Sequence, residues 1–192
     1  MQKLILASSS SYRKSLLDRL GLPYGTHAPD IDEQRLPGEE PEAMVRRLSE
    51  AKARAISGIY PDSLIIGSDQ VAVIDDTILT KPGNFANACQ QLRTQSGKKV
   101  RFLTGLALLN SNSGNCQVDI VTTDVVFKHL EEAEIANYLK RDEPYSCAGS
   151  FRSEGLGITL FEAIHSNDPT ALIGLPLLRL CQMLRTENYK IL

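Results

Sequence analysis

Short apolar runs alternate with segments of helical periodicity in the first third of the chain. The runs at residues 3–7 and 64–67 are typical of buried strands. Residues 12–20 carry three leucines on one side and are followed by Gly21, which predicts a short helix. Residues 41–56 begin with proline and place apolar side chains on one arc of about 140°, so they predict a longer amphipathic helix.

The rest of the chain continues this alternation and adds hairpins. A hairpin is expected across residues 71–79, and Asn84 stands where it can cap a helix that ends at Ser96-Gly97. Because strands alternate with helices while hairpins intervene, the pattern predicts an α/β fold with a mixed sheet. The further predicted elements are strands at 99–109, 117–128 and 158–164, and helices at 131–141 and 170–186, the last interrupted at Pro176.

Composition and charge exclude several classes of protein. The 192 residues include 21 Lys and Arg against 23 Asp and Glu, and 42% are hydrophobic, which predicts one globular domain spanning residues 1–192. The net charge of −2 argues against a nucleic-acid coat or a polybasic membrane binder, so neither partner is expected. Four widely spaced cysteines and an apolar N-terminal stretch too short for a signal peptide predict a reduced, cytoplasmic protein. A homodimer is left open.

The first candidate site is a serine cluster at the start of a predicted helix. Ser8 to Ser11 stand between the first strand and the first helix, and Arg13 and Lys14 follow in the first turn. Unpaired backbone N–H groups, hydroxyls and cations at a helix start suit a phosphate group. A plain serine N-cap with surface cations is the alternative, and the cluster taken alone favours it.

Two lysines are placed unusually. Lys52 lies inside the apolar arc of the helix at residues 41–56, where a lysine either reaches to the surface or points into a cleft. If it points inward, replacing it by methionine is expected to keep or raise stability. Lys81 stands beside Pro82 and is either a phosphate clamp or an ordinary turn lysine.

Carboxylates complete the set of candidate groups. Asp69 follows the apolar strand at 64–67, and Glu33 belongs to an acidic loop with Asp30 and Asp32. Such groups can bind Mg²⁺ or Mn²⁺ or accept a proton, and their ordinary alternatives are a turn cap and solvated loop charge. Combined with the serines and lysines, these residues are typical of a site for a metal-bound polyphosphate.

Six motifs, taken in order, resemble a known family. They are LILASSSSYRK at 4–14, DE at 32–33, SEAKA at 49–53, IIGSDQ at 65–70, KP at 81–82 and CAGSFRSEGLG at 147–157. The chain resembles the Maf family of nucleotide pyrophosphatases, most closely its 7-methyl-GTP pyrophosphatase subfamily. This resemblance implies a single Maf-like α/β domain, similar to inosine triphosphate pyrophosphatases, with two lobes around a cleft. It also implies cleavage of a nucleoside triphosphate to the monophosphate and pyrophosphate, with a divalent metal, Mg²⁺ or Mn²⁺.

The resemblance also implies roles for individual residues. Asp69 matches the family's proton acceptor, and Glu33 matches an acid of the same site; both are candidate metal ligands. The sequence leaves open whether Asp69 acts as the base or as a ligand. The positions that match the phosphate side are Ser8, Arg13, Lys52 and Lys81, and those that match substrate choice are Tyr12, Gln70 and Glu154.

Departures from the family pattern point to the same branch. The usual opening is ASxSPRR, whereas here Ser11 replaces the proline and Tyr12 the first arginine. The pyrimidine-specific branch has DT after its strand, whereas this chain has Asp69-Gln70. An aromatic residue at position 12 and glutamine at position 70 fit the methyl-GTP branch.

The chemistry of the base supports this reading independently. N7-methylation gives guanine a positive charge, which an aromatic face such as that of Tyr12 attracts by about 0.5–2 kcal/mol. The Glu154 carboxylate can accept hydrogen bonds from the guanine N1–H and amine and balance the charge. The function expected from the sequence is therefore hydrolysis of 7-methyl-GTP. The alternatives are a dTTP/UTP pyrophosphatase of the same family and a non-catalytic nucleotide-binding regulator of cell division.

Overall fold

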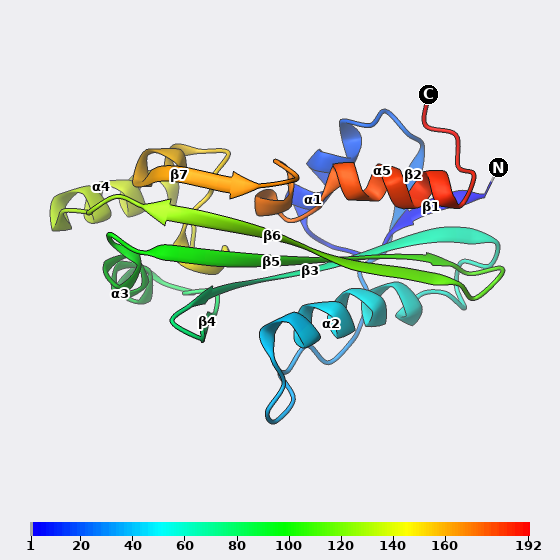
Figure 1. The fold of residues 1–192 in the computed structure, drawn as a ribbon, viewed down its shortest axis with the longest axis horizontal. Coiled ribbons are helices and arrows are strands. Elements are labelled where there is room, and N and C mark those ends of the chain that lie inside the picture. The colour runs from blue at the N-terminus through cyan, green and yellow to red at the C-terminus, as the bar shows by residue number, and fades with distance from the viewer. Residues whose placement is uncertain (1) are drawn as a thin grey trace. The chain divides into compact units, whose positions relative to one another are not determined.

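The computed structural model describes residues 2–192 and contains the predicted mixture of strands and helices (Figure 1). The strands are β1 (Lys3–Leu6), β2 (Tyr24–Thr26), β3 (Ser63–Ile74), β4 (Thr77–Leu79), β5 (Lys99–Asn110), β6 (Cys116–Phe127) and β7 (Phe161–Ser166). The α-helices are α1 (Ser11–Asp18), α2 (Pro41–Ala55), α3 (Phe85–Gln95), α4 (Glu132–Asp142) and α5 (Leu177–Thr186). Three short 3₁₀ helices lie at Ala148–Ser150, Leu156–Leu160 and Ala171–Ile173.

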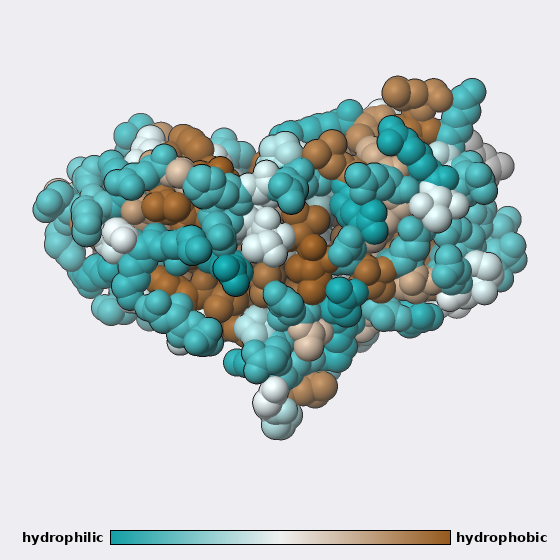
Figure 2. All heavy atoms as spheres, in the orientation of Figure 1, coloured by the Kyte–Doolittle hydropathy of each residue, from teal (hydrophilic) through white to brown (hydrophobic). Residues whose placement is uncertain are grey.

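The strands form one mixed sheet, which confirms the predicted fold class. Their hydrogen-bonded order is β2-β1-β3-β5-β6-β7, and β4 pairs with β3 away from this path. β1 runs parallel to both β2 and β3, whereas β3 and β4, like β6 and β7, pair antiparallel. No helix within residues 2–192 is long and apolar enough to cross a membrane. Figure 2 shows mainly hydrophilic residues on the visible face, in keeping with the 23% of charged residues.

The chain divides into two compact units. The first comprises Met1–Asp69, Thr104–Val121 and Asp168–Leu192, and the second Gln70–Leu103 and Thr122–Asn167. In the first unit, α1 and α5 cover one face of the sheet and α2 covers the other (Figure 1).

The core of the first unit follows from the alternation of side chains along its strands. In β1, Leu4 and Leu6 belong to a cluster with the leucines of α1 and α5, whereas Ile5 belongs to a second cluster with Ala53 and Ile56. Successive strand residues point to opposite faces, so each apolar strand residue has a helix to pack against. This is why β1, β3 and β5 carry continuous apolar runs rather than alternating ones.

Two glycines bring α2 unusually close to the sheet. A Cβ atom on Gly67 of β3 would lie 2.1 Å from the Ser49 backbone oxygen, and one on Gly105 of β5 would lie 2.6 Å from the Val45 backbone oxygen. Both oxygens belong to α2, so no side chain fits at either strand position. The close approach fixes the distance between the helix and β3, and with it the place of Lys52.

Replacing Gly67 with alanine is therefore expected to destabilise the protein by about 3 kcal/mol or more, because the backbone of α2 must move away. Thermal unfolding followed by circular dichroism measures the change. Gly58→Ala is the matched control, because no atom lies within 4 Å of the added methyl group there. Equal melting temperatures for the two variants would contradict the close packing of α2.

The second unit has its own aromatic core. Phe151 makes edge-to-face contacts with Phe102, Phe127 and Phe161, at ring-centroid distances of 5.3, 5.6 and 4.7 Å. α3 packs against α4 in this unit. The predicted hairpin is confirmed: β3 and β4 are joined at Asp75-Asp76, both with positive φ, as a tight two-residue turn requires.

Three sequence expectations need correction. The strand predicted at 64–67 does not end before Asp69, because β3 continues to Ile74 and carries Asp69 in its middle. The strand predicted at 158–164 starts only at Phe161, because residues 156–160 form a 3₁₀ helix. In α2, the apolar arc predicted from the sequence includes Ala55 and leaves out Ala53, whereas in the structure Ala55 is exposed and Ala53 is buried.

Candidate active site

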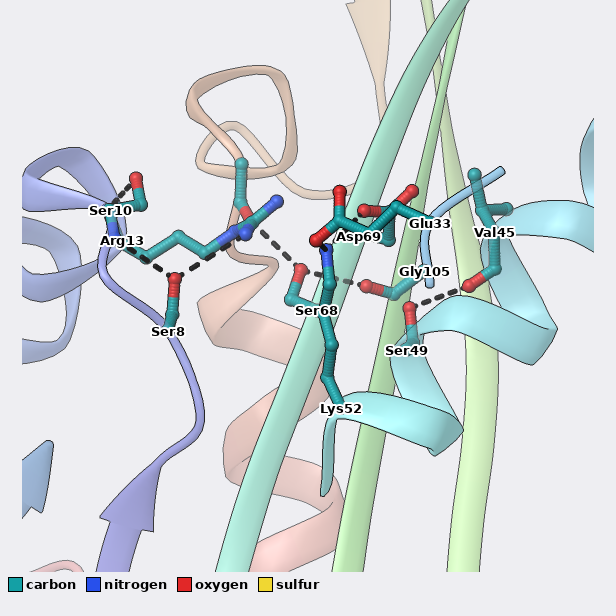
Figure 3. A network of polar contacts seen from close by, with 11 residues as sticks. Ser8, Ser10, Arg13, Glu33, Val45, Ser49, Lys52, Ser68, Asp69 and Gly105 are labelled. Carbon is teal, nitrogen blue, oxygen red and sulfur yellow. Dashed lines mark hydrogen bonds and ion pairs between the residues drawn. The ribbon is translucent and has the colours of Figure 1, made fainter. Parts of the chain in front are cut away.

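The loop between β1 and α1 presents the serine cluster. Ser8 is buried, and its Oγ accepts a hydrogen bond from the Ser10 backbone N–H at 3.1 Å. Ser10 is the N-cap of α1 and accepts from the Arg13 backbone N–H at 3.4 Å. The predicted cap is confirmed, and it places Arg13 beside Ser8, with 3.5 Å between the guanidinium and Ser8 Oγ (Figure 3).

Arg13 provides a positive charge that no carboxylate of residues 2–192 pairs with. Its Nε donates to the Gly174 carbonyl at 2.9 Å, and within residues 2–192 it forms no ion pair. Burial lowers the pKa of Arg13, although the charges of Asp69 and Glu33 act in the opposite direction. A partly buried cation of this kind is less well solvated than one in water, and an anionic ligand would compensate it.

Lys52 joins two carboxylates. Its Nζ lies 2.6 Å from Asp69 Oδ1 and 3.0 Å from Glu33 Oε1. The side chains of Lys52 and Asp69 are 7% and 11% exposed, whereas that of Glu33 is 57% exposed. Lys52 therefore points inward from the apolar side of α2, which confirms its predicted place in the arc, and ends in a polar cluster rather than at the surface (Figure 3).

Ser68 fixes the strand segment that carries Asp69. Its Oγ lies 2.8 Å from the Gly105 carbonyl and 3.0 Å from the Gly174 carbonyl. The Gly174 carbonyl is thus shared by Ser68 and Arg13. The contacts connect the β1–α1 loop, β3 and the turn before α5 in one polar network (Figure 3).

The donor set suits a divalent cation that is held partly by phosphate. Glu33 and Asp69 share Lys52, so their oxygens lie close enough to face one ligand. Within residues 2–192 there is no group of three or more His, Cys, Asp or Glu that could hold a metal ion by itself. Mg²⁺ is commonly bound by one or two carboxylates, water and substrate phosphates, and this arrangement fits that pattern.

The remaining predicted residues lie on separate elements. Tyr12 is partly buried in the first turn of α1, in the same unit as the Lys52 cluster. Gln70, Lys81 and Glu154 belong to the second unit. There, Gln70 is partly buried on β3, Lys81 is exposed after β4, and Glu154 is exposed and accepts from Ser153 Oγ at 3.3 Å.

Two residues missed by the sequence analysis, Tyr138 and Asp142, hold the loop that carries Glu154. Asp142, at the end of α4, is buried and pairs with Arg152. Its Oδ2 accepts from the Tyr138 hydroxyl at 2.8 Å, and that hydroxyl accepts from the Arg152 backbone N–H at 3.1 Å. Burial raises the pKa of Tyr138, so the phenol keeps its proton. Charged residues at a helix end usually face water, so no pattern marks Asp142 as buried.

Comparisons with known proteins identify the family of the chain. The family model described as Maf-like protein matches residues 3–187. A 7-methyl-GTP pyrophosphatase of Chromohalobacter salexigens is 56% identical over 185 residues, covering 96% of both chains. Proteins of the same name from Pseudomonas putida and Pseudomonas aeruginosa are each 54% identical, covering 98% and 100% of both chains. With a family match across nearly its whole length and relatives above half identity, the chain belongs to the Maf family.

Proposed function

We propose that this chain hydrolyses 7-methyl-GTP to 7-methyl-GMP and pyrophosphate in the cytoplasm. The observation that carries the proposal is the joining of Asp69 and Glu33 by buried Lys52, in the same polar network as the unpaired cation of Arg13. Cations and carboxylates in one network are the groups that phosphoanhydride hydrolysis requires. The full-length relatives named for this activity support the choice of substrate. The four free cysteines are typical of a reducing compartment.

In the proposed reaction, a water oxygen attacks the α-phosphorus and the bond from that phosphorus to the α–β bridging oxygen breaks. Pyrophosphate leaves with the electron pair of that bond, and the attacking water loses a proton. Asp69 accepts this proton at its carboxylate, while Lys52 stabilises the negative charge that develops on the phosphate oxygens and Arg13 binds the phosphates. A divalent cation held by Glu33 and Asp69 would supply Lewis-acid stabilisation of the same charge.

Pyrophosphate release from a panel of nucleotides tests this proposal. We expect 7-methyl-GTP to be hydrolysed with the highest kcat/KM in the presence of Mg²⁺ or Mn²⁺, and EDTA to stop the reaction. Preference for dTTP or UTP would instead identify the chain as a pyrimidine-specific member of its family. Nucleotide binding without any pyrophosphate release would identify a non-catalytic regulator.

Replacing Tyr12 with alanine is expected to lower kcat/KM for 7-methyl-GTP more than for GTP. Only the methylated ring carries a positive charge, and its attraction to an aromatic face is worth about 0.5–2 kcal/mol. The measurement is kcat/KM for both nucleotides, converted to free energies. Tyr12→Phe is the matched variant: it keeps the aromatic ring at the start of α1 and should therefore keep the preference for 7-methyl-GTP.

Replacing Glu154 with glutamine should have the same selective effect, because the amide cannot balance the charge of methylated guanine. Metal dependence should not change, since the substitution leaves the phosphate-binding groups intact. Glu162→Gln is the control, because Glu162 is an exposed glutamate of the same unit. Equal losses on GTP and 7-methyl-GTP would mean that each residue contributes to activity without distinguishing the methylated base.

A further inference from the structure

A tight turn before α5 is built around a buried carboxylate. Asp168 is 2% exposed, and its Oδ1 accepts from the backbone N–H and the hydroxyl of Thr170 at 3.0 and 2.7 Å. Its Oδ2 accepts from the backbone N–H groups of Leu178 and Arg179 at 2.8 and 3.2 Å. One side chain thereby ties the start of the turn to the first turn of α5.

Thr170 closes the same turn from inside. Its Oγ1 lies 2.8 Å from the Leu175 carbonyl and accepts from the Leu177 backbone N–H at 2.8 Å. From the sheet, Thr104 of β5 donates its hydroxyl to the Ala171 carbonyl at 3.0 Å. Residues on both sides of Gly174 are therefore held by side-chain hydrogen bonds, which leaves its carbonyl little freedom to reorient.

The Gly174 carbonyl faces the proposed site. It accepts a hydrogen bond from Arg13 Nε at 2.9 Å and lies 3.0 Å from Ser68 Oγ. Ser68 directly precedes Asp69 in the sequence. Gly174 has a φ of 119°, and the Arg13 side chain lies within 4 Å of the place a Cβ would take. One carbonyl thus holds the guanidinium at Nε, while one terminal nitrogen of the same group lies 3.5 Å from Ser8 Oγ.

We propose that Thr170 and Asp168 are positioning residues that hold the Gly174 carbonyl and, through it, aim the Arg13 guanidinium at the phosphates of the substrate. The inference rests on the proposed function for its substrate. Its ligand chemistry, a polyphosphate anion, can be tested separately with pyrophosphate. A pre-oriented guanidinium binds an anion more tightly than a mobile one, because less side-chain freedom is lost on binding.

The test compares Thr170→Val, which keeps the shape and removes the hydroxyl, with Thr170→Ser, which retains it. We expect Thr170→Val to raise the KM for 7-methyl-GTP and the Kd for pyrophosphate about tenfold, the scale of a hydrogen bond to a charged group. Its kcat should stay within about twofold of the wild-type value, because Asp69 and Lys52 are untouched. Thr170→Ser should restore both KM and Kd.

A double-mutant cycle separates positioning from general support of the fold. In an Arg13→Met background, Thr170→Val should raise the Kd for pyrophosphate no further, because its effect passes through Arg13. Thr186→Val is the matched control: Thr186 is exposed near the end of α5, its hydroxyl donates to the Gln182 carbonyl of the same helix, and its loss should leave the Kd unchanged.

Several results would overturn the inference. These are an unchanged Kd in Thr170→Val, a loss of kcat alone, and full additivity with Arg13→Met. If Thr170→Val does not fold, Thr104→Val loosens the same turn from β5 and carries the same expectations. A wild-type protein that binds pyrophosphate without hydrolysing any nucleotide would refute the proposed function, while the Kd values would still decide the role of Thr170.

Discussion

Replacing Asp69 with asparagine is expected to lower kcat for 7-methyl-GTP at least about a hundredfold while the protein stays folded. The amide keeps the shape of the side chain and can still accept a hydrogen bond from Lys52, which lies 2.6 Å away. It loses the charge and the basicity that proton transfer requires, and general-base catalysis contributes about that factor. Single-turnover kinetics with saturating substrate and metal measure the loss in the chemical step.

Asp62→Asn provides the control, because Asp62 directly precedes β3, the strand that carries Asp69. Asp62 is exposed just before β3 and has a positive φ, which asparagine tolerates well. It should leave both kcat and the melting temperature at wild-type values. If folded Asp69→Asn retained near-normal turnover, Asp69 would have no part in the reaction.

Metal titration distinguishes the two roles left open for Asp69, general base and metal ligand. As a general base only, Asp69→Asn would lower kcat and leave the Mn²⁺ concentration for half-maximal activity unchanged. As a metal ligand, the same substitution would raise that concentration, because one of the two carboxylates near Lys52 is lost.

Local periodicity was sufficient to place Lys52. The angular position of a residue on a helix depends only on its spacing from its neighbours, and Lys52 falls between Leu48 and Ile56 on the predicted arc. All three side chains are buried. The helix pattern does not predict that Asp69 is the partner of Lys52, because Asp69 lies 17 residues further along the chain on another element.

Asp69 illustrates why the strand boundary was predicted wrongly. Ser68, Asp69 and Gln70 interrupt an apolar run, which ordinarily marks the end of a buried strand. Here β3 continues, because Ser68 finds acceptors at Gly105 and Gly174, and Asp69 is paired with Lys52. Buried polar groups are tolerated in a strand when such partners exist, and those partners are distant in sequence.

The contact between Gly174 and Arg13 could not be predicted from the sequence for the same reason. Gly174 and Arg13 are 161 positions apart, and the contact uses a backbone carbonyl, which every residue has. No pattern of residue types predicts such a bond. By contrast, the break at Pro176 was predicted correctly, because proline restricts its own backbone and that of its neighbour: α5 begins at Leu177.

Replacing Lys52 with methionine is expected to lower kcat/KM about a hundredfold, the loss typical of removing one charged group that stabilises a transition state. The structure also reverses the expectation that methionine would keep or raise stability. Lys52 is the ion-pair partner of Asp69, whose side chain is only 11% exposed. Removing one partner of a buried pair leaves an uncompensated charge and costs about 3 kcal/mol, which thermal unfolding at neutral pH should detect.

Two further variants test this interpretation of Lys52. Adding Asp69→Asn to Lys52→Met should recover most of the lost stability without restoring activity, because the buried charge is then gone. Arg54→Met, on the exposed side of the same helix, removes only a surface pair with Glu50 and should change neither property by much. A Lys52→Met protein as stable as the wild type, with intact kinetics, would show that the cluster of Lys52, Asp69 and Glu33 takes no part in phosphate binding or in folding.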